Sequence, residues 1–183
     1  MSDLVRNTAR TRRAILDAAE RTFAASGGEA SIARIAAAAG VSKSGLLHHF
    51  PTRQDLIRAV AVDGIDRFRS EVLAQVDLTE NRPGKLLRAY VRAMCDPKEA
   101  ITAAFAATSL GAVLRATPGV TELFAEDELR WRADLAADGL PIERVLLIRY
   151  GAEGVVGALS SWMIDPNDLI TVRNELLALA EPD

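Results

Sequence analysis

The chain has 183 residues, enough for one or two domains, and 49% of them are hydrophobic, which is ample for a packed core. Alanine is frequent and aromatic residues are scarce, so the composition favours helices. Cys95 is the single cysteine, which excludes a disulfide within the chain and a zinc site built from several cysteines. There is no signal-like segment and no apolar stretch long enough to cross a bilayer, so we expect a soluble cytoplasmic protein with no membrane partner.

The net charge of −3 is distributed unevenly along the chain. Residues 1–60 carry a formal charge of +4, which leaves −7 on the remainder. A cationic first part and an anionic remainder suit a protein that meets phosphate with one surface only. Chance clustering of charged residues would give the same pattern. The asymmetry therefore supports a phosphate-binding surface but does not establish one by itself.

The first helix is predicted over residues 8–26, where apolar residues recur on one face and Gly27-Gly28 end it. We expect residues 1–7 to fray. Four arginines crowd its beginning: Arg6, Arg10, Arg12 and Arg13. Positive charge at this end opposes the helix dipole, so phosphate contact is one explanation of their placement and plain solvation is the other.

The stretch from Ser31 to Arg53 predicts two short helices joined by a tight turn. Ser31 and Ser42 can each cap a helix with a hydroxyl, and Gly40 stands where the first of the two must end. Leu46 lies four residues before Phe50, which gives the second helix one apolar face. Its other face carries small and polar residues: Lys43, Ser44, Gly45 and His48. Such a helix can enter a DNA major groove, although an ordinary solvated helical hairpin fits the same pattern.

Three motifs in this stretch are spaced as a set: Gly40-Val41-Ser42, His49-Phe50, and Arg53 three positions after the phenylalanine. With them, the run of residues 39–56 resembles the DNA-binding domain of the tetracycline-repressor (TetR/AcrR) family. The resemblance covers residues 8–61 by motif and the rest by length and helical layout.

The resemblance implies that double-stranded DNA is a partner and assigns contacts by position. Lys43, Ser44 and Gly45 would face base edges. Phosphates would be met by seven residues: Ser31, His48, His49, Arg53, Arg10, Arg12 and Arg13. Leu47 stands where the family usually has tyrosine, and Ala33 is too short to reach a base, so we expect readout by Lys43 and Ser44 together with DNA shape.

The adjacent histidines do not predict a metal site. Neighbouring side chains on a helix diverge by about 100°, and no third ligand lies nearby in the sequence. We therefore expect neither a metal nor a cofactor.

A long fourth helix is predicted over residues 53–75, opened by a capping box formed by Thr52 and Asp55. We place the domain boundary within it, which gives a helix-turn-helix domain over 1–61 and a helical regulatory and dimerisation domain over 62–183. Further helix starts are marked by Pro83, Asp96-Pro97, Thr117-Pro118, Pro141 and Asp165-Pro166. The prediction is an all-α protein of about nine helices.

The last two helices carry apolar and small residues at helical spacing. In the family the last two long helices of each subunit form a dimer interface. The predicted interface residues are Gly151, Gly154, Val155, Ala158, Leu159, Leu169, Val172 and Leu176. The alternative is that these residues form the internal core of one chain.

Most of the large side chains fall in the middle helices. In the family this region encloses a small-molecule cavity, and the candidate pocket residues are Tyr90, Met94, Phe105, Phe124, Trp131 and Trp162. The alternative for each of them is a place in the core. Arg88 and Arg92 could contact an anionic ligand, but we expect them to face solvent.

These patterns favour a dimeric DNA-binding transcription regulator, in particular a repressor of a palindromic operator that a small apolar or amphipathic ligand releases. An enzyme is disfavoured, because the sequence lacks a Gly-rich phosphate loop, a His-Glu-x-x-His motif and a nucleophile elbow. The remaining alternative is a helical ligand-binding or scaffolding protein without regulated DNA binding.

Overall fold

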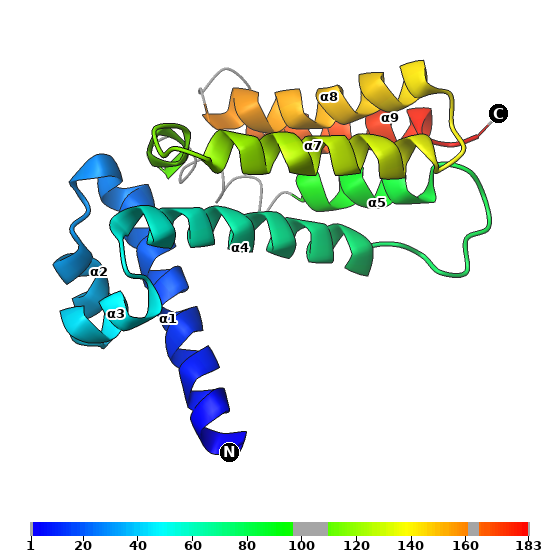
Figure 1. The fold of residues 1–183 in the computed structure, drawn as a ribbon. Coiled ribbons are helices and arrows are strands. Elements are labelled where there is room, and N and C mark those ends of the chain that lie inside the picture. Colours follow the sequence, from blue (N-terminus) through cyan, green and yellow to red (C-terminus); the bar gives the residue numbers. More distant parts are fainter. Residues whose placement is uncertain (1, 97–109, 161–164, 183) are drawn as a thin grey trace. The chain divides into compact units, whose positions relative to one another are not determined.

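The computed structural model describes residues 2–96, 110–160 and 165–182, and their secondary structure is entirely helical (Figure 1). The helices are α1 (Ser2–Ser26), α2 (Ile32–Ala38), α3 (Lys43–His49), α4 (Arg53–Ala74), α5 (Lys85–Met94), α7 (Val120–Ala136), α8 (Ile142–Ser160) and α9 (Pro166–Leu179). A 3-10 turn covers Gly27–Glu29, and residues 110–115 are also helical. The predicted all-α fold is confirmed.

Three helix starts differ from the prediction. Helix α1 already begins at Ser2, not at Thr8. Helix α5 begins at Lys85, because Gly84 at φ +83° interrupts the chain after Pro83. Helix α7 begins at Val120, after a turn that contains Gly119 at φ +77°. The start predicted at Asp96-Pro97 lies outside the described residues.

The chain forms two compact units. The amino-terminal unit comprises residues 1–64 and 106–124, and the carboxy-terminal unit comprises residues 65–105 and 125–183. Helices α4 and α7 each contribute to both units. Within the described residues, no helix is long and apolar enough to span a membrane.

The amino-terminal unit is built around an apolar core shared by α1, α2, α3 and the first part of α4. Fully buried members include Ile15, Phe23, Ile35, Leu46 and Leu56. The capping box predicted before α4 is present. The backbone N–H of Thr52 donates to Asp55 Oδ2 and the N–H of Asp55 donates to Thr52 Oγ1, both at 3.0 Å, so the start of α4 is fixed by its own sequence.

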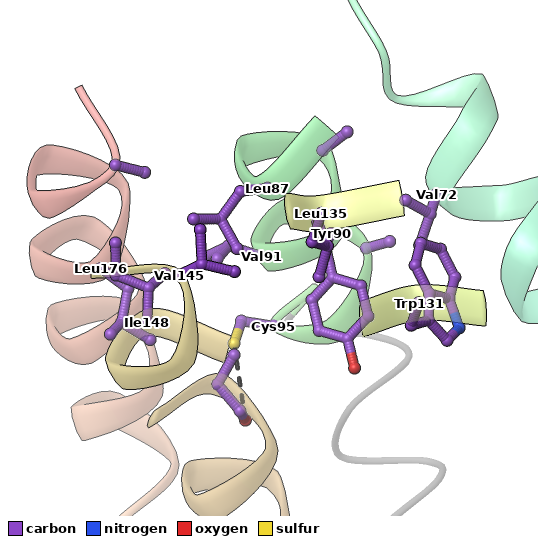
Figure 2. Close-up of a cluster of buried hydrophobic side chains, with 14 of the residues drawn as sticks. Val72, Leu87, Tyr90, Val91, Cys95, Trp131, Leu135, Val145, Ile148 and Leu176 are labelled. Carbon is purple, nitrogen blue, oxygen red and sulfur yellow. Dashed lines mark hydrogen bonds between the residues drawn. The ribbon is translucent and has the colours of Figure 1, made fainter. Parts of the chain in front are cut away.

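The core of the carboxy-terminal unit gathers apolar side chains from α4, α5, α7, α8 and α9 (Figure 2). Leu87, Ile148 and Leu169 are fully buried in it. The rings of Tyr90 and Trp131 lie side by side in Figure 2, with their centroids 5.1 Å apart in an edge-to-face arrangement that aromatic quadrupoles favour.

Arg88 is buried, which contradicts the expectation that it faces solvent. Its side chain is 1% exposed and pairs with Glu80 Oε1 at 2.5 Å. It also donates to the carbonyls of Pro83 and Ala180, so it joins the loop before α5 to the end of α9. Burial alone would raise the pKa of Glu80, but hydrogen bonds from Arg88 and Arg82 hold that pKa below its ordinary value.

Replacing Arg88 is therefore expected to destabilise the fold. Arg88→Met should lower the free energy of unfolding at pH 7 by about 3 kcal/mol, because the Glu80 carboxylate then remains buried with Arg82 as its charged partner. The difference from the wild type should shrink as pH falls below about 4.5, where an ordinary Glu carboxyl becomes protonated. Urea unfolding monitored by circular dichroism measures both effects. The exposed Arg132→Met serves as control, and a penalty that does not change with pH would contradict the ion-pair explanation.

Candidate DNA-binding site

The two helices of the predicted motif are short, and each begins with a serine cap. The N–H of Gly45 donates to Ser42 Oγ at 3.0 Å and the N–H of Arg34 donates to Ser31 Oγ at 3.2 Å. Gly40 adopts φ +69° in the turn between α2 and α3, a conformation that glycine takes without strain. The sequence thus specifies both helices and the turn.

The outward face of α3 is free of large apolar side chains. Leu46 and Phe50 are buried on the inner side, whereas Lys43 and Ser44 are exposed. Gly45 is half-buried, and a Cβ built there would lie 3.2 Å from Ser42 Oγ. A larger residue at position 45 would therefore press on the cap that starts the helix. The structure brings Lys43 and Ser44 together on a surface that a groove could accept.

The remaining polar residues of the motif differ in accessibility. Ser31 and His48 are exposed, whereas His49 is half-buried. The two imidazole rings lie edge to face, with centroids 5.7 Å apart. Leu47 is partly buried and packs against the core of the unit, so the position where the family usually has tyrosine contributes to packing.

Two of the α1 arginines predicted to contact phosphate have partners within the chain. Arg13 pairs with Asp17 and with Asp63 Oδ1, the latter at 2.5 Å, and hydrogen bonds with these carboxylates raise its pKa. Arg10 donates to Asn7 Oδ1 at 3.0 Å. Arg12 is exposed, and its guanidinium lies 4.7 Å from the centroid of the Phe50 ring.

Arg53 is also used within the chain. Its guanidinium donates to the carbonyls of Ala30 and Gly28, the latter at 3.0 Å, and lies 5.1 Å from the Phe23 ring centroid. It therefore holds the 3-10 turn before α2 against the start of α4. The sequence pattern marked this position as important without showing that its donors point at backbone carbonyls.

The candidate pocket residues are not all found in one place. Tyr90 and Trp131 lie together in the carboxy-terminal core, and Met94 packs partly buried against it. Phe124 belongs to the amino-terminal unit and is 42% exposed. Phe105 and Trp162 lie outside the described residues.

A partly buried polar cluster surrounds Tyr90, and sequence reasoning missed it. The Tyr90 hydroxyl donates to Glu153 Oε1 at 2.8 Å, and burial followed by the Glu153 charge raises the pKa of this tyrosine. Arg149 is 4% exposed; its Nε donates to Glu153 at 2.9 Å and its two terminal nitrogens donate to Glu128. Arg149 and Glu153 are four residues apart on α8, a spacing from which the sequence could have predicted their contact. The contact of Arg149 with Glu128 on α7 could not be predicted, because these residues meet only in the folded chain.

Several residues predicted to form a dimer interface pack within their own chain. Val155, Leu169 and Leu176 are buried in the carboxy-terminal core. A Cβ at Gly151 would lie 2.9 Å from Leu176 Cδ2, so this glycine allows α8 and α9 to approach each other. Gly154 is exposed, and no atom of the described residues lies within 4 Å of a Cβ built there. The other three, Ala158, Leu159 and Val172, are half-buried.

These features define a helix-turn-helix protein of the DNA-binding class. The model of the bacterial regulatory proteins of the tetR family matches residues 15–60, and the model of the tetracyclin repressor-like C-terminal domain matches residues 84–181. The chain belongs to the tetR family and is a transcriptional regulator.

Solved structures with similar folds cover nearly the whole chain. A transcriptional regulator from Rhodococcus sp. Rha1 is 22% identical with a TM-score of 0.70, covering 93% of this chain and 94% of its own. The fatty acid degradation regulator FadR from Bacillus halodurans is 19% identical with a TM-score of 0.70, covering 90% and 97%. AibR, in complex with isovaleryl coenzyme A and operator DNA, is 22% identical with a TM-score of 0.61, covering 92% and 96%. No curated protein matches the chain.

The placement of Arg53 predicts a stability role. Arg53→Met should lower the free energy of unfolding by about 1–3 kcal/mol, because the Ala30 and Gly28 carbonyls lose a charged donor. Chemical denaturation compared with the exposed Arg21→Met measures the effect. Unchanged stability together with lost DNA binding would instead assign Arg53 to phosphate contact.

Proposed function

We propose that this transcriptional regulator binds a palindromic operator as a homodimer and represses transcription until a small apolar or amphipathic ligand occupies its carboxy-terminal unit. The observation that carries the proposal is the outward face of α3. There the exposed Lys43 and Ser44 lie next to Gly45. The opposite side of the helix is fixed by the buried side chains of Leu46 and Phe50.

The chemistry of this face suits base readout in the major groove. The Lys43 ammonium can donate to O6 and N7 of guanine, and the Ser44 hydroxyl can donate to or accept from several bases. Ser44 Oγ lies 3.0 Å from Ser42 Oγ, so its rotamer has a local partner while its outer side stays accessible. Phosphate contacts would set the register and these two side chains would select the sequence.

A dimer is proposed because a recognition helix of seven residues reads few base pairs alone. Two copies would present their α3 helices about 34 Å apart, one turn of DNA, to half-sites related by a twofold axis. The exposed apolar residues of α8 and α9 offer a contact surface. Leu147 is 64% exposed, Tyr150 49% and Ile170 48%, and Gly154 continues the α8 stripe at helical spacing.

Ligand response is proposed from the core of the carboxy-terminal unit and from the relatives. The rings of Phe68, Tyr90 and Trp131 form an aromatic cluster in which Phe68 belongs to α4. The AibR structure holds isovaleryl coenzyme A and operator DNA, which makes an acyl thioester a reasonable first ligand to test. A ligand that binds one state better than the other would shift α4, and this continuous helix carries the change toward Arg53 and α3.

The alternative, a helical binding or scaffolding protein without regulated DNA binding, is favoured by one observation. Arg13 and Arg53 are engaged within the chain, which leaves fewer cations for phosphate. Salt dependence separates the two proposals, because counterion release makes specific and non-specific DNA binding weaken steeply as salt is added.

Removing the Lys43 ammonium tests the base-reading assignment. A duplex selected from a random library by the wild-type protein should bind Lys43→Ala about 10-fold or more weakly, with relaxed preference at one base pair of each half-site. Fluorescence anisotropy at fixed salt measures the affinity. The exposed Arg132→Ala removes the same charge from the other unit and should bind as the wild type does. Unchanged affinity and preference in Lys43→Ala would count against α3 as the recognition helix.

A charge on the exposed face of α8 tests the dimer. Tyr150→Glu should shift the protein from dimer to monomer, because a carboxylate would be buried without a partner at the proposed interface. Analytical ultracentrifugation measures the change in mass. Leu129→Glu on α7, where leucine is 67% exposed, is the matched control and should leave the dimer intact. A Tyr150→Glu protein that stays dimeric would place the interface elsewhere.

A further inference from the structure

The helix-turn-helix segment carries no carboxylate over residues 30–54, between Glu29 and Asp55. Its Lys and Arg side chains are Arg34, Lys43 and Arg53, and Arg53 is held by backbone carbonyls. Two long cationic side chains on this segment therefore remain available to a partner.

Arg34 is placed unusually within α2. Its N–H donates to Ser31 Oγ, so it stands in the first turn, where a positive side chain opposes the helix dipole. The rest of the exposed face of α2 consists of Ala33, Ala37 and Ala38. Arg34 is exposed, and in the described part of the chain no carboxylate or carbonyl accepts from its guanidinium. Neither the helix nor an ion pair accounts for an arginine at this position.

Arg12 lies on α1, and its N–H groups are likewise available to a partner. It is exposed, and its guanidinium lies over the ring of Phe50, the C-cap residue of α3, 4.7 Å from the ring centroid. A cation–π contact uses the charge of the guanidinium and does not consume its N–H groups, so these stay available to another acceptor. The contact thus places the donors of Arg12 beside the end of the recognition helix.

We propose that Arg34 contacts the DNA backbone together with Arg12, whereas Arg13 and Arg53 stabilise the fold and contact no phosphate. This assignment rests on the proposed DNA-binding function. It adds a contact from α2 and removes two arginines from the predicted phosphate set. It follows from the partners of each guanidinium: a cation already paired with Asp17 and Asp63 gains little from a phosphate.

The slope of log affinity against log salt concentration tests the proposal, because each phosphate neutralised contributes about 0.9 to that slope. Arg34→Gln and Arg12→Gln should each reduce the slope by about 0.9 and weaken binding uniformly across duplex sequences. Arg13→Gln and Arg53→Gln should leave the slope unchanged at temperatures where they remain folded. Arg21→Gln is the matched control, since Arg21 is exposed on α1 nine residues from Arg12, about 180° around the helix.

The outcomes separate this assignment from the proposed function. A steep wild-type slope that Arg34→Gln leaves unchanged would overturn the Arg34 contact while the DNA-binding function stands. An equal loss of slope in Arg21→Gln would overturn it too, because general charge would then explain the effect. Absence of salt-dependent binding by the wild type would overturn both. Thermal unfolding of Arg34→Gln should match the wild type, which excludes misfolding as the cause of a changed slope.

Discussion

The packing of the inner side of α3 is the constraint on which the rest of the site depends. Leu46 and Phe50 are buried to 0% and 2% exposure against the core that α1, α2 and α4 share. A seven-residue helix has too few hydrogen bonds to be stable alone, so this tertiary packing fixes its position and its rotation. Once the rotation is fixed, Lys43 and Ser44 must point outward.

The arginines show how one residue type is divided between folding and recognition. Arg53 supplies donors to two carbonyls at the turn before α2, and Arg13 joins α1 to α4 through Asp63. These contacts connect the elements around the helix-turn-helix without placing a large apolar side chain on its outer face. Part of the cationic charge of residues 1–60 is therefore committed within the unit, because Arg13 is paired with carboxylates and donors of Arg53 are used by backbone carbonyls.

Local signals predicted the fold better than the site. The serine caps, Gly40 and the Thr52–Asp55 box act within a few residues of each other, so the sequence shows them directly. The sequence does not reveal that Arg88 is buried. Its partners Glu80, Pro83 and Ala180 come from segments that meet only in the folded chain. The contact between Arg149 and Glu128 on another helix was hidden for the same reason. Periodicity identifies a buried face, but it does not show which distant residue satisfies a buried charge.

Two glycines of α8, Gly151 and Gly154, differ in whether a contact within the chain explains them. A glycine inside a helix costs about 1 kcal/mol relative to alanine, so each one calls for a compensating contact. Gly151 has such a contact inside the chain, since Leu176 of α9 occupies the space that a side chain would need. Gly154 has none within 4 Å, and it lies on the exposed face that also carries Leu147 and Tyr150. Gly151 therefore serves the packing of α9, whereas the part of the chain that the structure describes offers no such contact to Gly154, and a second copy would supply it in the proposed dimer.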